Sequence, residues 1–211
     1  MAITYPLTLP ATNGECDLAD MEITNINAVS VAVSPYTGVR QKQDWSRNQL
    51  VVRATTIPMQ KANALKWWSF LRALRSGLGT FYMGDPHNTV SQGTAATSPG
   101  APLVAGGSQT GNSLNIDGCP ANETGWLLDG DWIQLGSGSS SRLYTVVGDV
   151  DTNGSGEATI EFMPALRSSP ADNATVTIAD TVGVFELMED VAFPVNQDHL
   201  YVLQFAAIEV P

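Results

Sequence analysis

The stretch Pro58–Gly77, PMQKANALKWWSFLRALRSG, is the only run in the chain whose pattern predicts a long α-helix. Pro58 suits the first helical turn because proline has no backbone N–H to leave unpaired, and Gly77 suits the left-handed position after a helix end. Apolar residues recur at helical spacing, and these are Ala64, Trp67, Leu71, Leu74 and Leu78, widened by Trp68 and Phe70. We expect this stripe to face a core beneath a β-sheet rather than to line a cofactor or partner groove.

The composition indicates a folded protein with an acidic surface. The 211 residues suffice for one large β domain or two small ones. The chain has 21 Asp and Glu residues against 10 Lys and Arg residues, which gives a net charge of −11. This balance argues against specific nucleic-acid binding, because phosphate contacts need clustered Lys and Arg side chains.

The cysteines and the N-terminus bear on the compartment in which the protein is made. Cys16 and Cys119 are too few for a disulfide framework, so both are expected to be thiols made in a reducing compartment. A single disulfide between them is the alternative. The N-terminal MAITYPLTLP lacks a basic region followed by an apolar run, so no signal peptide is expected. No apolar run is long enough to predict a membrane span.

Strand patterns lie on both sides of the predicted helix. The first is an extended arm in residues 1–16, in which Ile3, Tyr5, Leu7 and Leu9 alternate with other residues. Such alternation is typical of an edge strand, or of an arm that adds to the sheet of a neighbour. The other predicted elements are an extended stretch from Met21 to Val33 with one change of register, a turn at Ser34–Gly38, strands at Val39–Trp45 and Gln49–Thr56 joined by the polar Ser46–Asn48, and a strand with a turn at Gly79–Pro86.

The middle of the chain has a different composition. Residues 86–113 are dense in Ser, Thr, Gly, Ala and Pro, which predicts a linker or surface loop. Short strand patterns then recur at regular spacing between polar turns, as in a small β-barrel or sandwich. We expect these strands at Ser113–Ile116, Trp132–Leu135, Arg142–Val147, Ala158–Phe162 and Thr175–Ile178, followed by two last strands at Val184–Met188 and Leu200–Glu209.

We therefore predict a mainly β protein with two domains. The outer domain combines residues 1–99 with residues 184–211, because the N-terminal strands are too few to close alone and the C-terminal pair completes them. Residues 100–183 form a small OB- or galectin-like β-barrel or sandwich domain, inserted into a loop of the outer domain. Insertions of this kind are tolerated where chain ends lie close together.

The best metal candidate is Asp149–Glu157, DVDTNGSGE, whose alternating oxygen ligands match the first half of a calcium loop. The match fails at the twelfth position, where Ile160 replaces a bidentate carboxylate. A tight hairpin turn explains the same residues, and we favour the turn. His87 and His199 lack a nucleophile motif nearby, so both are expected to be solvated histidines rather than catalytic ones.

Two further pairs of residues have both a chemical and a structural interpretation. Asp129 and Asp131 are candidates for a glycosidase acid/base pair, but they flank a glycine, and we favour turn chemistry. Trp126 and Trp132 are candidates for stacking on a sugar, but a β-barrel core also uses tryptophan. The sequence therefore assigns no catalytic, cofactor-binding or metal-binding residue.

A set of residues occurs along most of the chain in the same order as in a known protein family. In the first part these residues are Ser34-Pro-Tyr-Thr-Gly38, Gln41, Trp45, Pro58-Met59, Trp68, Phe70-Leu71, Leu74, Gly77, Phe81 and Gly84-Asp85. In the second part they are Gly107-Ser-Gln-Thr-Gly111, Ser113-Leu114, Gly130-Asp131-Trp132, Arg142-Leu-Tyr144, Gly156-Glu-Ala-Thr-Ile160, Pro164, Leu166-Arg167-Ser-Ser-Pro170 and Phe185-Glu-Leu187. In this order they resemble the distal tail proteins, or tail-adaptor baseplate proteins, of long-tailed bacteriophages.

The resemblance implies a β-sandwich belt domain with one helix, and an outward-facing β-barrel domain. It implies a structural virion protein without enzymatic activity or cofactors, made in the cytoplasm of the bacterial host. The implied assembly is a homo-oligomeric ring, expected to be a hexamer, that joins the tail tube protein to the hub or tip and to host-recognition proteins.

Physical arguments fit this resemblance. DNA passes through such a ring, and an acidic lumen would repel phosphate rather than bind it. A strand added by an N-terminal arm is one way to bind the next subunit of a ring. We hypothesise that residues 1–9 make this contact, with Ile3, Tyr5, Leu7 and Leu9 as the interface residues.

The residues leave two other functions open. One is a carbohydrate-binding β-module used in host attachment, with a host-surface carbohydrate as its partner. The other is a small hydrolase, for which no set of nucleophile, base and orienting residue can be named. A ring-shaped particle favours the tail protein, and a monomer that responds to oligosaccharide favours the binding module.

Overall fold

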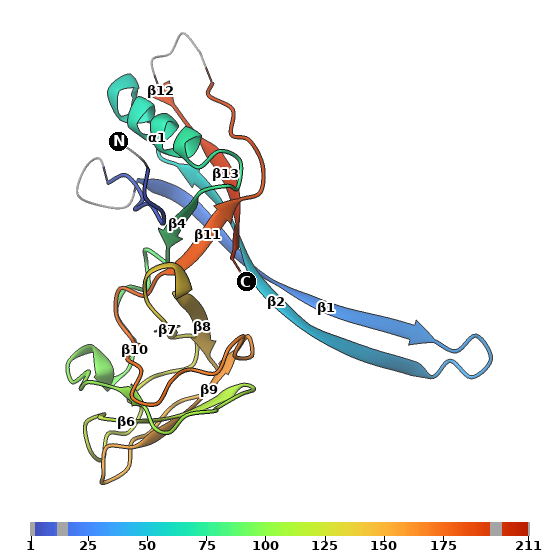
Figure 1. Ribbon diagram of the computed structural model, residues 1–211, viewed down its shortest axis with the longest axis vertical. Helices are drawn as coiled ribbons and strands as arrows, with labels where there is room; N and C mark the ends of the chain where they lie inside the picture. The colour runs from blue at the N-terminus through green and yellow to red at the C-terminus, as the bar shows by residue number, and fades with distance from the viewer. Residues whose placement is uncertain (1–2, 12–16, 195–199, 211) are drawn as a thin grey trace.

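The computed structural model describes residues 3–11, 17–194 and 200–210, and the protein is mainly β, as the sequence predicts. Two antiparallel sheets contain most of the strands, and each sheet has its own cluster of buried apolar side chains. Figure 1 shows the two sheets, with a long hairpin that extends away from both of them. Within the described residues there is no helix with the length and hydrophobicity needed to span a bilayer.

The first sheet is built from both ends of the chain. Its five strands lie in the order β1-β2-β13-β11-β4, and neighbouring strands are antiparallel. They are β1 (Leu18–Val33), β2 (Arg40–Thr56), β13 (Gln204–Glu209), β11 (Gly183–Leu187) and β4 (Thr80–Met83). The C-terminal strands therefore complete a sheet that the N-terminal strands begin, as expected.

Helix α1 (Lys61–Ala73) covers one face of this sheet. Trp67 is 1 % exposed, and its ring packs edge-on against Phe70 with 6.0 Å between the ring centroids. The indole Nε1 of Trp67 donates a hydrogen bond of 3.0 Å to Asp17 Oδ2, which satisfies its polar atom inside the core. Ala64, Leu71 and Leu74 are also buried, so the predicted core stripe is confirmed over these positions.

The predicted bounds of the helix need correction at both ends. Pro58 is not in the first turn, because the next two residues form the short strand β3 (Met59–Gln60), which pairs with β12 (Leu200–Tyr201). Leu78 is 71 % exposed, so it does not extend the stripe. Gly77 has the expected positive φ of +90°, and a Cβ there would lie 2.8 Å from the carbonyl oxygen of Leu187.

Two strand predictions are also wrong. The predicted break at Ser46–Asn48 does not exist, because β2 is continuous from Arg40 to Thr56 and an irregular register opposite Asn27 to Val29 absorbs the extra residues. The predicted last strand is broken between β12 and β13. There Leu203 exchanges hydrogen bonds of 2.9 Å with Thr56, which moves the chain from its pairing with β3 to its pairing with β2.

The second sheet is built from the middle of the chain. Its six strands lie in the order β10-β7-β8-β9-β6-β5. They are β10 (Val176–Thr177), β7 (Trp132–Leu135), β8 (Arg142–Val146), β9 (Ala158–Met163), β6 (Ser113–Asp117) and β5 (Leu103–Val104), with 3-10 turns at Thr94–Ala96 and Gly138–Ser140. A bridge between Leu103 and Thr175 joins the two edges, so the sheet is nearly closed into a barrel.

Candidate assembly surface and the junction between the sheets

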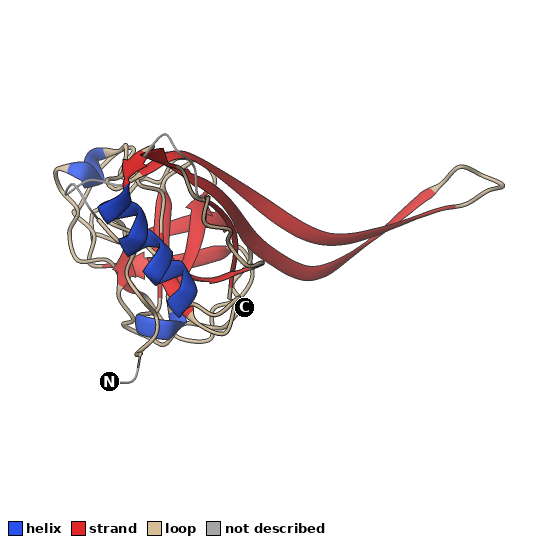
Figure 2. Ribbon diagram, turned by 90° about the horizontal axis from the view of Figure 1, so that it is seen from above, coloured by secondary structure: helices blue, strands red, loops and turns tan. Residues whose placement is uncertain are grey.

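Strands β1 and β2 continue beyond the first sheet as a two-stranded ribbon. Strand β13 pairs with β2 only from Val51 to Thr55, whereas β1 and β2 stay paired as far as Val33 and Arg40. We call residues 27–48 the hairpin arm, and Figures 1 and 2 show it curving away from the rest of the chain. Both of its backbone edges therefore lack a neighbouring strand within the described residues.

One face of the hairpin arm presents a row of valines. Residues directly opposite each other in an antiparallel pair point to the same face. Val31 lies opposite Lys42 and Val33 lies opposite Arg40, and Val29 precedes them on the same face. The three valines are 48 %, 51 % and 52 % exposed in chain order. The face therefore combines exposed apolar side chains with two cationic positions, and with one acidic position, because Val29 lies opposite Asp44.

The outer part of the hairpin arm also exposes large apolar side chains. Tyr36 is 96 % exposed in the turn, Val39 just before β2 is 60 % exposed, and Trp45 on β2 is 66 % exposed. The turn itself is formed as expected, since Gly38 has a φ of +70° and its N–H donates to the carbonyl of Ser34 at 2.9 Å. Exposed apolar side chains and unpaired strand edges are typical of surfaces that contact other molecules.

The predicted N-terminal interface residues lie mostly against the chain's own core. Leu7 forms a bridge with Phe81 beside the edge strand β4, and Tyr5 and Leu9 are partly buried on the first core. The Tyr5 hydroxyl donates to the carbonyl of Ala73. Of the four, Ile3 is the exposed one, at 46 %. A contact between subunits through this segment stays a prediction.

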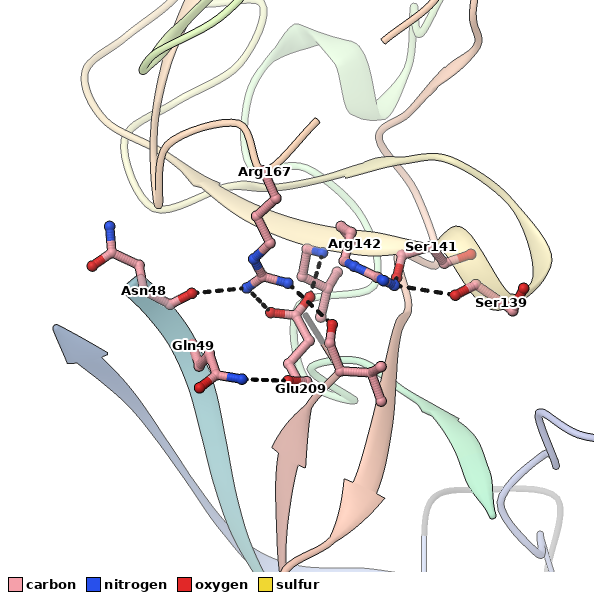
Figure 3. A network of polar contacts seen from close by, with 9 residues as sticks. Asn48, Gln49, Ser139, Ser141, Arg142, Arg167 and Glu209 are labelled. Atoms are coloured by element: carbon pink, nitrogen blue, oxygen red, sulfur yellow. Dashed lines mark hydrogen bonds and ion pairs between the residues drawn. The ribbon is translucent and has the colours of Figure 1, made fainter. Parts of the chain in front are cut away.

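A buried ion pair links the two sheets (Figure 3). Arg167, in the loop after β9, binds the carboxylate of Glu209 at the end of β13 through its Nη2. The side chain of Glu209 is completely buried and that of Arg167 is 17 % exposed. The second carboxylate oxygen of Glu209 accepts a hydrogen bond of 3.0 Å from the N–H of Leu143 on β8. Both oxygens of a buried carboxylate are thus satisfied by groups of the second sheet.

Backbone carbonyls of the first sheet complete this network. The Arg167 guanidinium also donates to the carbonyls of Asn48 at 3.3 Å and Val210 at 3.4 Å. The Gln49 amide donates to the Glu209 carbonyl at 3.3 Å. Removal of the arginine would therefore leave a buried carboxylate without its cation, and two carbonyls without this donor.

Neighbouring ionisable groups share this low-dielectric environment. Burial raises the pKa of the Tyr144 phenol, and burial lowers the pKa of the Arg142 guanidinium. The Arg142 side chain donates to the carbonyls of Ser139 and Ser141 at 3.2 and 3.0 Å. At the junction the Glu209 side chain is completely buried, whereas that of Arg167 keeps a limited exposure of 17 %.

Apolar contacts reinforce the junction. Trp132 on β7 and Leu143 on β8 belong to the second sheet, but they pack against the apolar core of the first sheet. A void of about 10 Å³ with an apolar lining remains among these two side chains, Met21, Ile23 and Phe185. The two sheets are therefore in direct apolar contact at the junction.

The carboxylates considered as an acid/base pair stabilise turns instead. Asp131 is completely buried and accepts hydrogen bonds of 2.9 Å from the N–H groups of Gln92 and Leu128. Asp129 accepts one of 3.2 Å from Gly148. The favoured interpretation as turn residues is confirmed, and Asp131 also holds the segment before the barrel in place.

The calcium-like segment is a hairpin turn, as favoured from the sequence. Asn153 Oδ1 accepts hydrogen bonds of 2.9 Å from the N–H groups of both Ser155 and Glu157, and β9 begins at the next residue. Asp151 Oδ1 accepts one of 2.7 Å from Gly125. Among the residues that the structure describes, no cluster of three or more His, Cys, Asp or Glu side chains is arranged to hold a metal ion.

Of the remaining candidates, the structure describes His87 and Cys119. His87 lies in a turn, where its N–H donates to Asp85 Oδ1 at 2.9 Å. Cys119 is a buried free thiol, and burial raises its pKa to about 11, which disfavours the reactive thiolate. Cys16 and His199 lie outside the described residues.

The tryptophans are not placed for stacking on a sugar. Trp126 is 0 % exposed in the barrel core, where its Nε1 donates to the carbonyl of Ser98 at 3.2 Å. Trp132 packs into the junction between the sheets. The idea of Trp126 as an exposed binding residue is therefore wrong, and both side chains fill cores.

The sequence predicts the strands and the turn of the hairpin arm but not their extension beyond the first sheet, and it gives no prediction of the Arg167–Glu209 pair. A signal for the pair exists in β13, because Glu209 continues the period-two series of buried Phe205 and Ala207. A carboxylate at a core position requires a buried partner. A scan of protein-family models and a search among curated proteins found no match to this chain.

Proposed function

We propose that this protein is a structural virion subunit that assembles into a ring, with six copies expected, at the distal end of a long phage tail. The observation that carries the proposal is the hairpin arm, whose valines and unpaired edges are exposed in the single chain. A surface of this kind is stable in solution when a partner covers it. An arm that contacts a different surface of the next copy gives a ring when the rotation closes.

The proposed architecture follows from the two sheets. Residues 1–99 and 184–211 form the belt domain of the ring, and residues 100–183 form an inserted barrel that faces outward. The packed junction supports this assignment, because a rigid connection transmits force between a ring and parts attached to its barrels. The ring joins the tail tube protein to the hub or tip and to host-recognition proteins.

We assign the face of the first sheet opposite α1 to the lumen of the ring. Asp20 and Glu22 point to this face, since they alternate with core residues along β1. Together with Glu189 they surround Arg53 in an open groove, so the local charge is negative. Such a face repels the phosphates of passing DNA.

A DNA gel-shift assay tests the lumen assignment. Rings with Asp20→Lys and Glu22→Lys should retain double-stranded DNA at low salt, and unsubstituted rings should not. The matched control carries Glu123→Lys and Glu157→Lys on the barrel, which make the same change in charge away from the lumen. Equal DNA binding by both variants would place the carboxylates outside the lumen.

Mass photometry of the purified protein tests the proposed function. We expect a species with the mass of a closed oligomer at micromolar concentration, and a monomer when residues 28–47 are replaced by an Asn-Gly turn. A chain that stays monomeric at every concentration, and whose elution shifts on titration with oligosaccharide, would contradict the ring and favour a carbohydrate-binding module.

A further inference from the structure

Charge is distributed very unevenly along this chain. Residues 40–75 hold eight of the ten Lys and Arg residues and a single acidic residue. Residues 100–183, which form the barrel, hold ten Asp and Glu residues and two arginines. Those two, Arg142 and Arg167, lie at the junction with the first sheet. The hairpin arm and helix are therefore cationic, and the rest of the barrel surface is acidic.

The barrel exposes large apolar side chains in one groove. Val147 and Met163 are 46 % and 42 % exposed, and in residues 100–183 all other large apolar side chains are more buried. Both line a groove of about 320 Å³ together with Glu161 and Phe162. Glu161 and Met163 point outward on β9, since they alternate with the core residues of that strand.

The hairpin arm carries the complementary pattern. Its valine face places Val31 beside Lys42 and Val33 beside Arg40. Neither cation makes an ion pair within the described part of the chain, and the same holds for Glu161 in the groove. An apolar row with cations thus matches an apolar groove with a carboxylate.

The two surfaces do not meet within one chain. In both ribbon views the hairpin arm runs away from the barrel of its own chain, and its valines remain exposed. The occupant of the groove must therefore come from another molecule, and the copy of this chain next to it supplies an arm of the right chemistry.

We propose that the hairpin arm of one copy docks into the Val147–Met163 groove on the barrel of the next copy. The valines cover Val147 and Met163, and Lys42, opposite Val31 in the middle of the row, pairs with Glu161. This contact joins two different surfaces, which is the arrangement that closes into a ring. The inference rests on the proposed ring function and names the surface that receives the arm.

Charge reversal on both sides of the contact tests this docking. Glu161→Lys and Lys42→Glu should each raise the dissociation constant for assembly by about tenfold or more, because like charges then face each other in the contact. The double variant should recover most of that loss, since the pair is restored with opposite polarity. Glu157→Lys is the matched control, because Glu157 directly precedes β9 but lines another groove. This variant should assemble normally.

Mass photometry gives the dissociation constants, and thermal melting by circular dichroism checks the fold of each variant. If Glu161→Lys melts early, Met163→Gln in the same groove provides the same readout. Normal assembly of the groove variants, or a double variant no better than the single ones, overturns the docking while leaving the ring intact. An unsubstituted protein that never assembles overturns the ring function itself.

Discussion

Replacing Arg167 with methionine tests how the two sheets are held together. Methionine keeps most of the aliphatic length but removes the guanidinium, which leaves the completely buried carboxylate of Glu209 with the Leu143 N–H as its remaining donor. Removing one partner of a buried ion pair costs about 3–5 kcal/mol. The Arg167 side chain is 17 % exposed, so water can reach the vacated space and we expect the lower value, about 3 kcal/mol.

The assay is urea unfolding at pH 7, with the hairpin arm removed so that assembly does not contribute. A double variant, Arg167→Met with Glu209→Leu, supplies the control, because an apolar pair can replace a buried ion pair at little cost. We expect it to lose clearly less free energy of unfolding than the sum of the single variants, by about 2 kcal/mol. A loss below about 1 kcal/mol for Arg167→Met would show that this pair contributes no more than a surface ion pair.

Three further predictions concern single side chains in the cores and turns. Gly77→Ala should lower the free energy of unfolding by about 1–3 kcal/mol, because the added Cβ meets the Leu187 carbonyl at a positive φ; an unchanged urea midpoint would refute this. Trp67→Phe should cost about 2–3 kcal/mol through the lost hydrogen bond to Asp17 and the cavity left behind, again measured by urea unfolding, and a loss under 1 kcal/mol would contradict it. The Cys119 thiol, with its pKa raised to about 11, should resist iodoacetamide at pH 8 until the protein is unfolded. Rapid labelling of the native protein at pH 8 would contradict this. Because the folded state favours the protonated thiol, the contribution of Cys119 to stability should be lost as pH rises from about 9 to about 11.

Much of the fold is visible in the sequence, because local pattern and burial agree there. The strand Ala158–Met163 alternates buried and exposed side chains along its whole length, as its residues predict. The helix stripe holds for the same reason, since Trp67 and Leu71 repeat at helical spacing beneath a sheet. In these elements one face is buried and the other is solvated, so the spacing of the apolar residues predicts the type of element and its buried face.

The hairpin arm could not be predicted as one element for the opposite reason. A two-stranded ribbon needs no buried face, so its sequence has no regular apolar period, and the polar run Ser46–Asn48 looks like a turn although β2 is continuous there. The junction between the sheets could not be predicted because Arg167 and Glu209 are 42 residues apart, and no local sequence pattern connects them. Both features depend on how distant segments are placed, which a linear pattern does not record.

The most direct test of the ring is an image of the purified protein. Negative-stain particles, averaged by class, should show rings with a central hole, and about six subunits are expected around it. The variant without residues 28–47 should give no rings under the same conditions. The unsubstituted protein should also be crosslinked at a much higher concentration and then diluted for imaging. Small isolated particles in that sample would contradict a role of the exposed hairpin arm in assembly.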